Sequence, residues 1–118
     1  MADSSLSHLD PQFAQAVEYL LAWADAEGLA PVVTETFRSA ERQDELYAQG
    51  RTAPGAIVTN ARGGQSPHQY GLAADVTSEF GYGSPQAKRI REIARQIGFG
   101  LITWDEPHVE WPNWRSRI

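Results

Sequence analysis

An acidic residue, Asp75, lies inside the short apolar run Leu72–Val76. A carboxylate in such a run is costly to bury unless it is paired with another group or bound to a metal ion. His68 lies seven residues earlier, across Gly71, and His108 follows later in a chain that has three histidines. Imidazole nitrogens and carboxylate oxygens bind zinc in catalytic sites, where three protein ligands leave one position for water. We therefore expect a fold that brings these segments together around Asp75.

Each of these residues also has a simpler interpretation. A single histidine is more often exposed or hydrogen-bonded than a metal ligand. His8, in the polar stretch before a helix start, is expected to be exposed. Asp75 could instead be a buried partner of Arg38 or a turn residue. The spacing of His68 and Asp75 favours a turn that enters an extended segment, and it differs from the helical His-Glu-x-x-His arrangement.

The order of helices and strands shows no repeating βαβ unit. Helix starts are indicated by capping residues, and in two cases a proline follows directly. The pattern predicts an α+β fold in which a small antiparallel sheet holds the metal and packs with about three helices. The expected helices run from Asp10 to about Gly28, from Ser39 to about Gln49 and from Ser84 to Gly98; the expected strands are Pro31–Phe37, Leu72–Thr77, Phe99–Trp104 and His108–Trp111, with a tight turn at Asp105–Pro107.

Composition indicates one ordinary globular domain. A chain of 118 residues is expected to form a single catalytic domain, residues 1–118, with one modest core. Its net charge of −5 argues against nucleic acid as the main partner, and we expect no membrane-crossing segment. Cysteine is absent, so no disulfide framework exists and thiols do not indicate a compartment.

Other segments have less specific signals. The stretch Arg51–Gln65 contains Gly, Pro, Asn and Thr without an apolar period, so we expect a loop that lines a substrate cleft. Arg91 and Arg95 are expected on the solvated side of the third helix. Aromatic residues near the motifs are expected to pack in the core rather than hold a substrate; they are Tyr70, Trp104, Trp111 and Trp114.

Three motifs occur in a fixed order along the chain. They are Thr36–Tyr47, with Arg38-Ser39, Gln43, Leu46 and Tyr47; the pattern Ser-x-His-x-x-Gly-x-Ala-x-Asp at Ser66–Asp75; and acid-x-x-His at Asp105–His108. From about Val32 to Trp111 the chain resembles the zinc peptidases of bacterial and phage peptidoglycan, which include vancomycin-resistance D-Ala-D-Ala carboxypeptidases and phage L-alanyl-D-glutamate endopeptidases. The resemblance implies the hedgehog/DD-peptidase fold and a zinc (Zn2+) cofactor.

The resemblance also implies roles for individual residues. His68, Asp75 and His108 are the implied metal ligands, Asp105 the general base, and Arg38 the group that steadies the substrate carbonyl or its oxyanion. We further predict substrate-binding roles for Ser66 and Gln43 beside Arg38, although Ser66 could be only a turn residue before Pro67.

Glu106 competes with Asp105 for the role of base. In a regular strand, residues two apart share a face, so Glu106 and Glu110 would lie with His108. Pro107 interrupts that regularity. The family pattern, and not the local physics, favours Asp105.

The resemblance implies hydrolysis of an amide bond in peptidoglycan stem peptides, most closely as a phage endolysin-like L-alanyl-D-glutamate endopeptidase. One alternative is a D-Ala-D-Ala carboxypeptidase, which must recognise a terminal carboxylate; Arg51 and Arg62 are the candidates. Another is a non-catalytic, zinc-stabilised peptidoglycan-binding or virion-structural protein. We expect a monomer of phage or prophage origin, made in the cytoplasm without a signal peptide, that acts on the cell wall or periplasm after release. Its expected partners are peptidoglycan peptides, and neither nucleic acid nor membrane.

Overall fold

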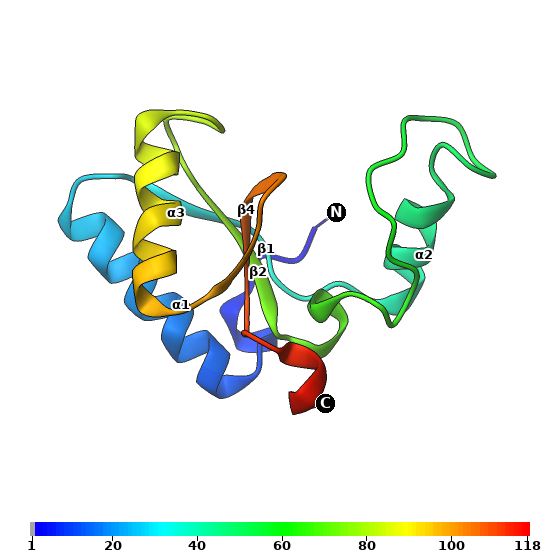
Figure 1. Cartoon of the computed structure of the whole chain (residues 1–118), viewed down its shortest axis with the longest axis horizontal. Coiled ribbons are helices and arrows are strands. Elements are labelled where there is room, and N and C mark those ends of the chain that lie inside the picture. Colours follow the sequence, from blue (N-terminus) through cyan, green and yellow to red (C-terminus); the bar gives the residue numbers. More distant parts are fainter. Residues whose placement is uncertain (1) are drawn as a thin grey trace.

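Four strands form one antiparallel sheet in the order β1-β2-β4-β3 (Figure 1). The computed structural model describes residues 2–118. Together with three α-helices, the sheet confirms the predicted α+β fold. The elements are η1 (Leu6–His8), α1 (Pro11–Ala26), β1 (Pro31–Glu35), α2 (Ala40–Ala48), η2 (Pro67–Tyr70), β2 (Ala73–Ser78), α3 (Pro85–Ile97), β3 (Gly100–Ile102), β4 (Asp105–Glu110) and η3 (Trp114–Arg117), where η denotes a 3-10 helix.

The predicted helix starts are confirmed by side-chain caps. The carboxylate of Asp10 accepts the backbone N–H groups of Gln12 and Phe13 at the start of α1. Ser39 and Ser84 accept a backbone N–H in the same way at the starts of α2 and α3. These bonds satisfy donors that the first turn of a helix leaves without a partner.

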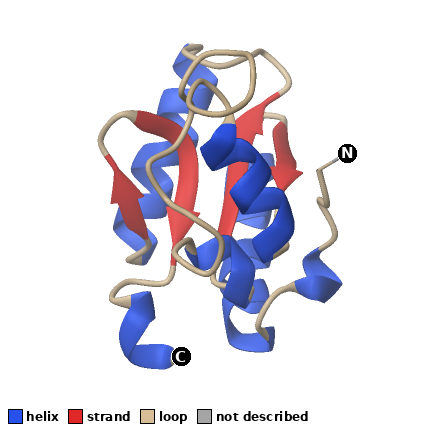
Figure 2. Cartoon of the chain, turned by 90° about the vertical axis from the view of Figure 1, so that its right-hand side faces the viewer, coloured by secondary structure: helices blue, strands red, loops and turns tan. Residues whose placement is uncertain are grey.

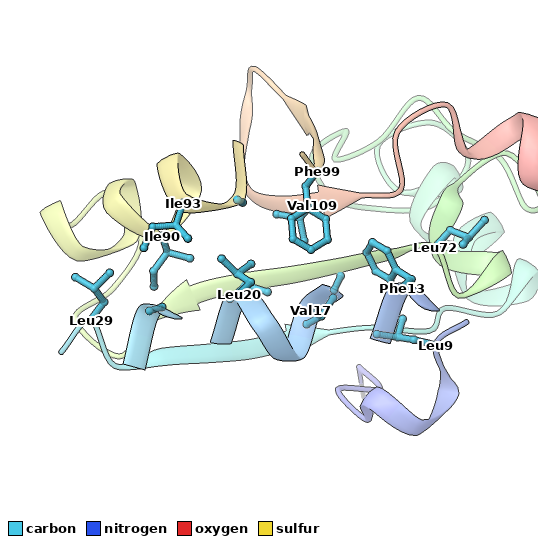
Figure 3. Close-up of a cluster of buried hydrophobic side chains, with 14 of the residues drawn as sticks. Leu9, Phe13, Val17, Leu20, Leu29, Leu72, Ile90, Ile93, Phe99 and Val109 are labelled. Atoms are coloured by element: carbon cyan, nitrogen blue, oxygen red, sulfur yellow. The ribbon is translucent and has the colours of Figure 1, made fainter. Parts of the chain in front are cut away.

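The hydrophobic core lies between the sheet and the helices α1 and α3 (Figure 3). Phe13 of α1 is fully buried and meets the ring of Phe99 edge to face, with the ring centroids 5.6 Å apart. Within the described chain, no residue from 34 to 71 belongs to this core. The buried apolar residues of the cluster are Leu9, Phe13, Val17, Leu20, Ala24, Leu29, Leu72, Ala74, Val76, Ile90, Ile93, Ala94, Phe99, Val109 and Trp114.

The helix α2 and the loop that follows it lie on the other side of the molecule from α1 and α3 (Figure 1). Figure 2 shows them in front of the strands, with the remaining long helices behind. We call residues 38–66 the cleft wall, because they face the sheet across the cleft described below.

The predicted turn at Asp105–Pro107 is wrong. The strands β3 and β4 are joined at Thr103–Trp104, and Pro107 lies inside β4. Leu101 pairs with Val109, whereas the next residue of β3 pairs with Asp105, so the intervening residues of β4 bulge without partners on β3. Proline is tolerated in such a bulge because no ladder hydrogen bond requires its missing N–H.

The prediction that the tryptophans pack in the core is wrong for Trp104 and correct for Trp111 and Trp114. Trp104 is 88% exposed at the tip of the β3–β4 turn, so the expectation that it packs in the core is wrong. Trp114 is buried in the core and Trp111 packs against it, as expected. None of the described helices is both long and apolar enough for a membrane span.

Candidate metal and catalytic site

The side chains of His68, Asp75 and His108 converge at one face of the sheet. One donor atom from each lies within 4.8 Å of the others. Asp75 Oδ1 is 3.5 Å from His68 Nε2 and 3.6 Å from His108 Nδ1. This oxygen is buried and has no hydrogen-bond partner, which is costly unless a cation satisfies it. The three residues therefore fit a metal ion.

Sheet register and a left-handed turn assemble this group. Asp75 on β2 and His108 on β4 are direct cross-strand partners. His68 comes from η2, and Gly71 turns the chain from η2 into β2 with φ of 70°. A Cβ at Gly71 would lie 2.8 Å from the backbone nitrogen of Asp10, so the turn requires glycine for space as well as for conformation.

Hydrogen bonds at the far ring nitrogens orient both histidines. His68 donates from Nδ1 to the carbonyl oxygen of Thr36, at 2.7 Å, which leaves Nε2 to face the site. His108 Nε2 lies 2.7 Å from Glu110 Oε1, which leaves Nδ1 to face Asp75. Such outer contacts set the tautomer and ring orientation of metal-binding histidines. Strand alternation correctly placed Glu110 on the His108 face, but its contact with the ring was not predicted.

The charges in the site favour a cation. Burial raises the pKa of Asp75, but the rings of His108 and His68, 3.6 and 3.5 Å from its Oδ1, outweigh that effect and hold the pKa well below its usual range. Burial lowers the pKa of His108, whereas the carboxylates of Asp75 and Glu110 raise it to about 9. Positive charge between these carboxylates is therefore stabilised, as a metal site requires.

Asp105, and not Glu106, faces the site. Asp105 is half-buried and lines the same cleft as the three candidate ligands. Burial and, after it, the negative charge of Asp75 raise the pKa of Asp105. Positive charges, including that of His108, lower this pKa but do not outweigh the increase. Glu106 points away and accepts the backbone N–H of Gly83 at 2.8 Å. The bulge in β4 breaks the regular alternation that would have put Glu106 beside His108.

Arg91 holds the backbone of this bulge. Its guanidinium donates to the carbonyl oxygens of Ile102, Asp105 and Glu106 at 2.8 to 3.2 Å. The expectation of a solvated Arg91 is wrong, because the side chain is half-buried against β3 and β4. The sequence contains no signal for this contact, since helix periodicity alone places Arg91 beside other basic residues.

Arg38 lines the cleft with its guanidinium fixed on two sides. It donates from Nε to Glu35 at 3.1 Å, pairs with the same carboxylate through Nη2, and donates from Nη1 to Gln43 Oε1 at 2.8 Å. Only 13% of its side chain is exposed. The partner of Arg38 is thus Glu35, and not the alternative partner Asp75.

Gln43 and Ser66 lie beside Arg38 and His68 but bond within the chain. Gln43 is fully buried and donates to the carbonyl oxygen of Ala61 at 2.7 Å. Ser66 accepts the backbone N–H of His68 at 3.3 Å and forms a capping box that starts η2. Both line the cleft, and their contact with substrate stays a prediction.

The cleft has a volume of about 1370 Å³. The site lies on the sheet side, and part of the expected loop Arg51–Gln65 lines the opposite side, which confirms that expectation. Arg51 and Arg62 do not line it, because both guanidinium groups lie over the ring of Tyr47. His8 is exposed, as expected, and contacts Asp3.

Comparison with known proteins identifies the family. The profile of a family described as VanY, D-alanyl-D-alanine carboxypeptidase, matches residues 6–114. The chain belongs to the VanY family of peptidases. The peptidoglycan L-alanyl-D-glutamate endopeptidase CwlK of Bacillus subtilis is 51% identical over 123 residues, which cover 88% of this chain and 74% of CwlK. The family consists of zinc-dependent peptidases of peptidoglycan, as the resemblance implied.

Solved structures share the VanY-type fold. The LD-carboxypeptidase LdcB superposes with a TM-score of 0.70 at 21% identity, over 87% of this chain and 58% of LdcB. The L-Ala D-Glu endopeptidase ChiX of Serratia marcescens superposes with a TM-score of 0.55 at 19% identity, over 99% of this chain and 93% of ChiX. At these identities the likeness establishes the fold alone.

Proposed function

We propose that this chain hydrolyses the L-alanyl-D-glutamate bond of peptidoglycan stem peptides. The observation that carries the proposal is the convergence of His68, Asp75 and His108 beside Asp105 in one cleft, in a chain 51% identical to CwlK. Zinc is the cofactor, because two imidazoles and one carboxylate are the donor set of catalytic zinc sites. A VanY relative of the same fold forms a complex with Zn(II).

Bound zinc supplies a Lewis acid for the amide carbonyl and lowers the pKa of a water molecule. Asp105 takes up a proton at its carboxylate and passes it to the leaving amine, a role that its raised pKa suits. Arg38, held by Glu35 and Gln43, stabilises negative charge on the substrate carbonyl oxygen. Because both partners fix the guanidinium before substrate arrives, little reorganisation is needed during the reaction.

Two alternatives are distinguished by specific features. The family's description favours a D-Ala-D-Ala carboxypeptidase, which removes only the terminal residue. A structural zinc site usually has four protein ligands. In the described part of the chain the ligand group has three members, and Asp105 lies in the same cleft, so a catalytic role is favoured over a structural one.

Digestion of purified peptidoglycan by the zinc-loaded protein tests the proposal, with and without a chelator. Mass spectrometry of the released peptides should find new D-glutamate amino termini that disappear when zinc is removed. Release of terminal D-alanine alone would establish the carboxypeptidase instead. Absence of cleavage by folded, metal-loaded protein would support the non-catalytic alternative.

The proposed place of action is the cell wall, because the CwlK relative is named for peptidoglycan. We also propose that the protein acts as a monomer, since each chain contains all the groups assigned to the reaction. Size-exclusion chromatography with light scattering tests the oligomeric state. An origin from phage or prophage stays a prediction.

A further inference from the structure

Three arginines line the cleft, and they differ in their partners. Arg38 is paired with Glu35 and Arg42 with Glu45. Arg115 lines the cleft as well, yet no carboxylate in the described part of the chain lies within ion-pair distance of it. Its guanidinium is therefore available to an anionic group that enters the cleft.

Aromatic stacking holds Arg115 in place. The guanidinium carbon lies 4.4 Å from the ring centroid of Trp114, which is only 5% exposed. Trp114 stacks on Tyr70, with centroids 5.7 Å apart, and the Tyr70 hydroxyl donates to the carbonyl oxygen of Gly64 at 2.7 Å. Tyr70 belongs to η2, which also carries His68. An arginine on such a platform loses less conformational freedom when it binds a ligand.

We propose that Arg115 binds a carboxylate of the stem peptide and selects substrates that carry it. This inference rests on the proposed function. A glutamate residue has two carboxyl groups, and only one of them can continue the peptide, so the substrate keeps at least one negative charge. The protein carries a net charge of −5, which repels such a peptide in general. A guanidinium matches a carboxylate in charge and in planar geometry, and it offsets that repulsion locally.

The family profile matches residues 6–114, so Arg115 lies directly beyond the matched segment. Arg51 and Arg62 were candidates for recognition of a terminal carboxylate by a carboxypeptidase, but both lie over Tyr47 and away from the cleft lining, which Arg115 joins.

Synthetic stem peptides test this assignment. One peptide carries every carboxylate free, and each further peptide has one of them converted to the amide. For the wild-type protein, one amidation should lower kcat/KM by about 10-fold or more, the loss expected for a hydrogen bond between charged groups. We call the peptide with this amidation the sensitive amide. The Arg115→Gln variant should cleave the fully acidic peptide with a kcat/KM lowered by the same factor, and its kcat/KM should no longer differ between this peptide and the sensitive amide. Zinc content and melting temperature should stay unchanged.

Arg117→Gln is the matched control. Arg117 lies in the same short helix over the ring of Trp111, but it pairs with Asp10 and does not line the cleft. This variant should keep the wild-type preference among the peptides. A second readout is the affinity of each peptide for the zinc-loaded Asp105→Asn variant, measured by calorimetry. Adding Arg115→Gln to this variant should weaken binding of the acidic peptide and leave binding of the sensitive amide unchanged.

The inference is overturned if Arg115→Gln keeps the wild-type preference, or if it slows all peptides equally. In either case cleavage at L-alanyl-D-glutamate by the wild-type protein would leave the proposed function intact. If the wild-type protein releases no D-glutamate amino terminus from any peptide, the proposed function itself fails. Binding to Asp105→Asn then decides separately whether Arg115 recognises a carboxylate.

Discussion

The two sides of the sheet are held together by different forces. On one side, α1 and α3 bury apolar side chains such as Phe13, Leu20 and Ile93 completely (Figure 3). On the other side, the cleft wall contributes no residue to that core, and polar contacts hold its segments together. Gln43 bonds to Ala61, and the carboxylate of Asp44 accepts the backbone N–H of Gly63 at 2.7 Å.

This difference separates stability from chemistry. Burial of apolar surface is the main favourable term in folding, so the packed side should supply most of the free energy of unfolding. Polar contacts contribute less net free energy but fix geometry. Substitutions on the packed side should therefore change stability first, whereas substitutions around the cleft should change activity first.

The sharpest contrast is expected for Asp105→Asn. Loss of the proton acceptor should lower kcat by about 10²- to 10⁴-fold, with zinc content and melting temperature retained. Glu106→Gln is the matched control, because its carboxylate bonds to Gly83 outside the cleft lining. Activity that survives in Asp105→Asn but is lost in Glu106→Gln would transfer the role of base to Glu106. Steady-state kinetics with metal analysis decides.

Phe13→Ala tests the packed side. The fully buried ring contacts Phe99, and its removal should lower the free energy of unfolding by about 3–5 kcal/mol. Denaturant titration of the zinc-loaded protein measures this loss, while kcat of the remaining folded protein should change little. If kcat falls in parallel with stability, the two sides of the sheet are not independent.

Gln43→Ala tests the cleft wall. It removes the acceptor of Arg38 and the donor to Ala61, so we expect a loss of about 1–3 kcal/mol, concentrated in the wall. Hydrogen exchange should show faster opening of residues 38–66 and unchanged protection of α1 and α3. Gln49→Ala removes an exposed contact at the end of the same helix and is the control. Uniform loss of protection would contradict the division.

Arg91 connects the two sides, because it lies on α3 and bonds to the backbone around Asp105. Arg91→Gln should lower kcat by about 10-fold through misplacement of Asp105. The KM and the zinc content should remain near wild type. Arg95→Gln, on the exposed part of the same helix, should leave kcat unchanged. An unaltered kcat in Arg91→Gln would mean that the bulge holds its shape without this contact.

The smallest effect is expected at the start of α1. Burial raises the pKa of Asp10, but the backbone N–H of Phe13 and the charge of Arg117 outweigh it, so the pKa is lowered on folding. The carboxylate therefore stabilises the fold above its ordinary pKa of 3.8, and this contribution is lost as the pH falls through the lowered value. Asp10→Ala should cost about 1 kcal/mol at neutral pH, and progressively less in acid. Thermal unfolding at several pH values checks both parts; a difference independent of pH would exclude the carboxylate as the cause.

Local sequence patterns determined the helices and the chemical groups of the site. Capping residues predicted the starts of all three helices, because a cap bonds to its own first turn. An acid within an apolar run marked Asp75, and the two histidine motifs supplied its neighbours. The helix starts and the choice of Asp75 needed only residue type and short-range spacing, whereas Asp105 and Arg38 were assigned from the family pattern.

Only the tertiary structure decided how the groups are arranged. Several contacts join residues that are distant in sequence. They are the pairing of Asp75 with His108, the bond of Arg91 to Ile102 and the bond of buried Gln43 to Ala61. Because of the same bulge, strand alternation does not place Glu106 on the face of His108. The turn between β3 and β4 lies at Thr103–Trp104 and not at Asp105–Pro107. Register and bulges depend on the whole sheet, so a local pattern identifies the donors but leaves their geometry to the fold.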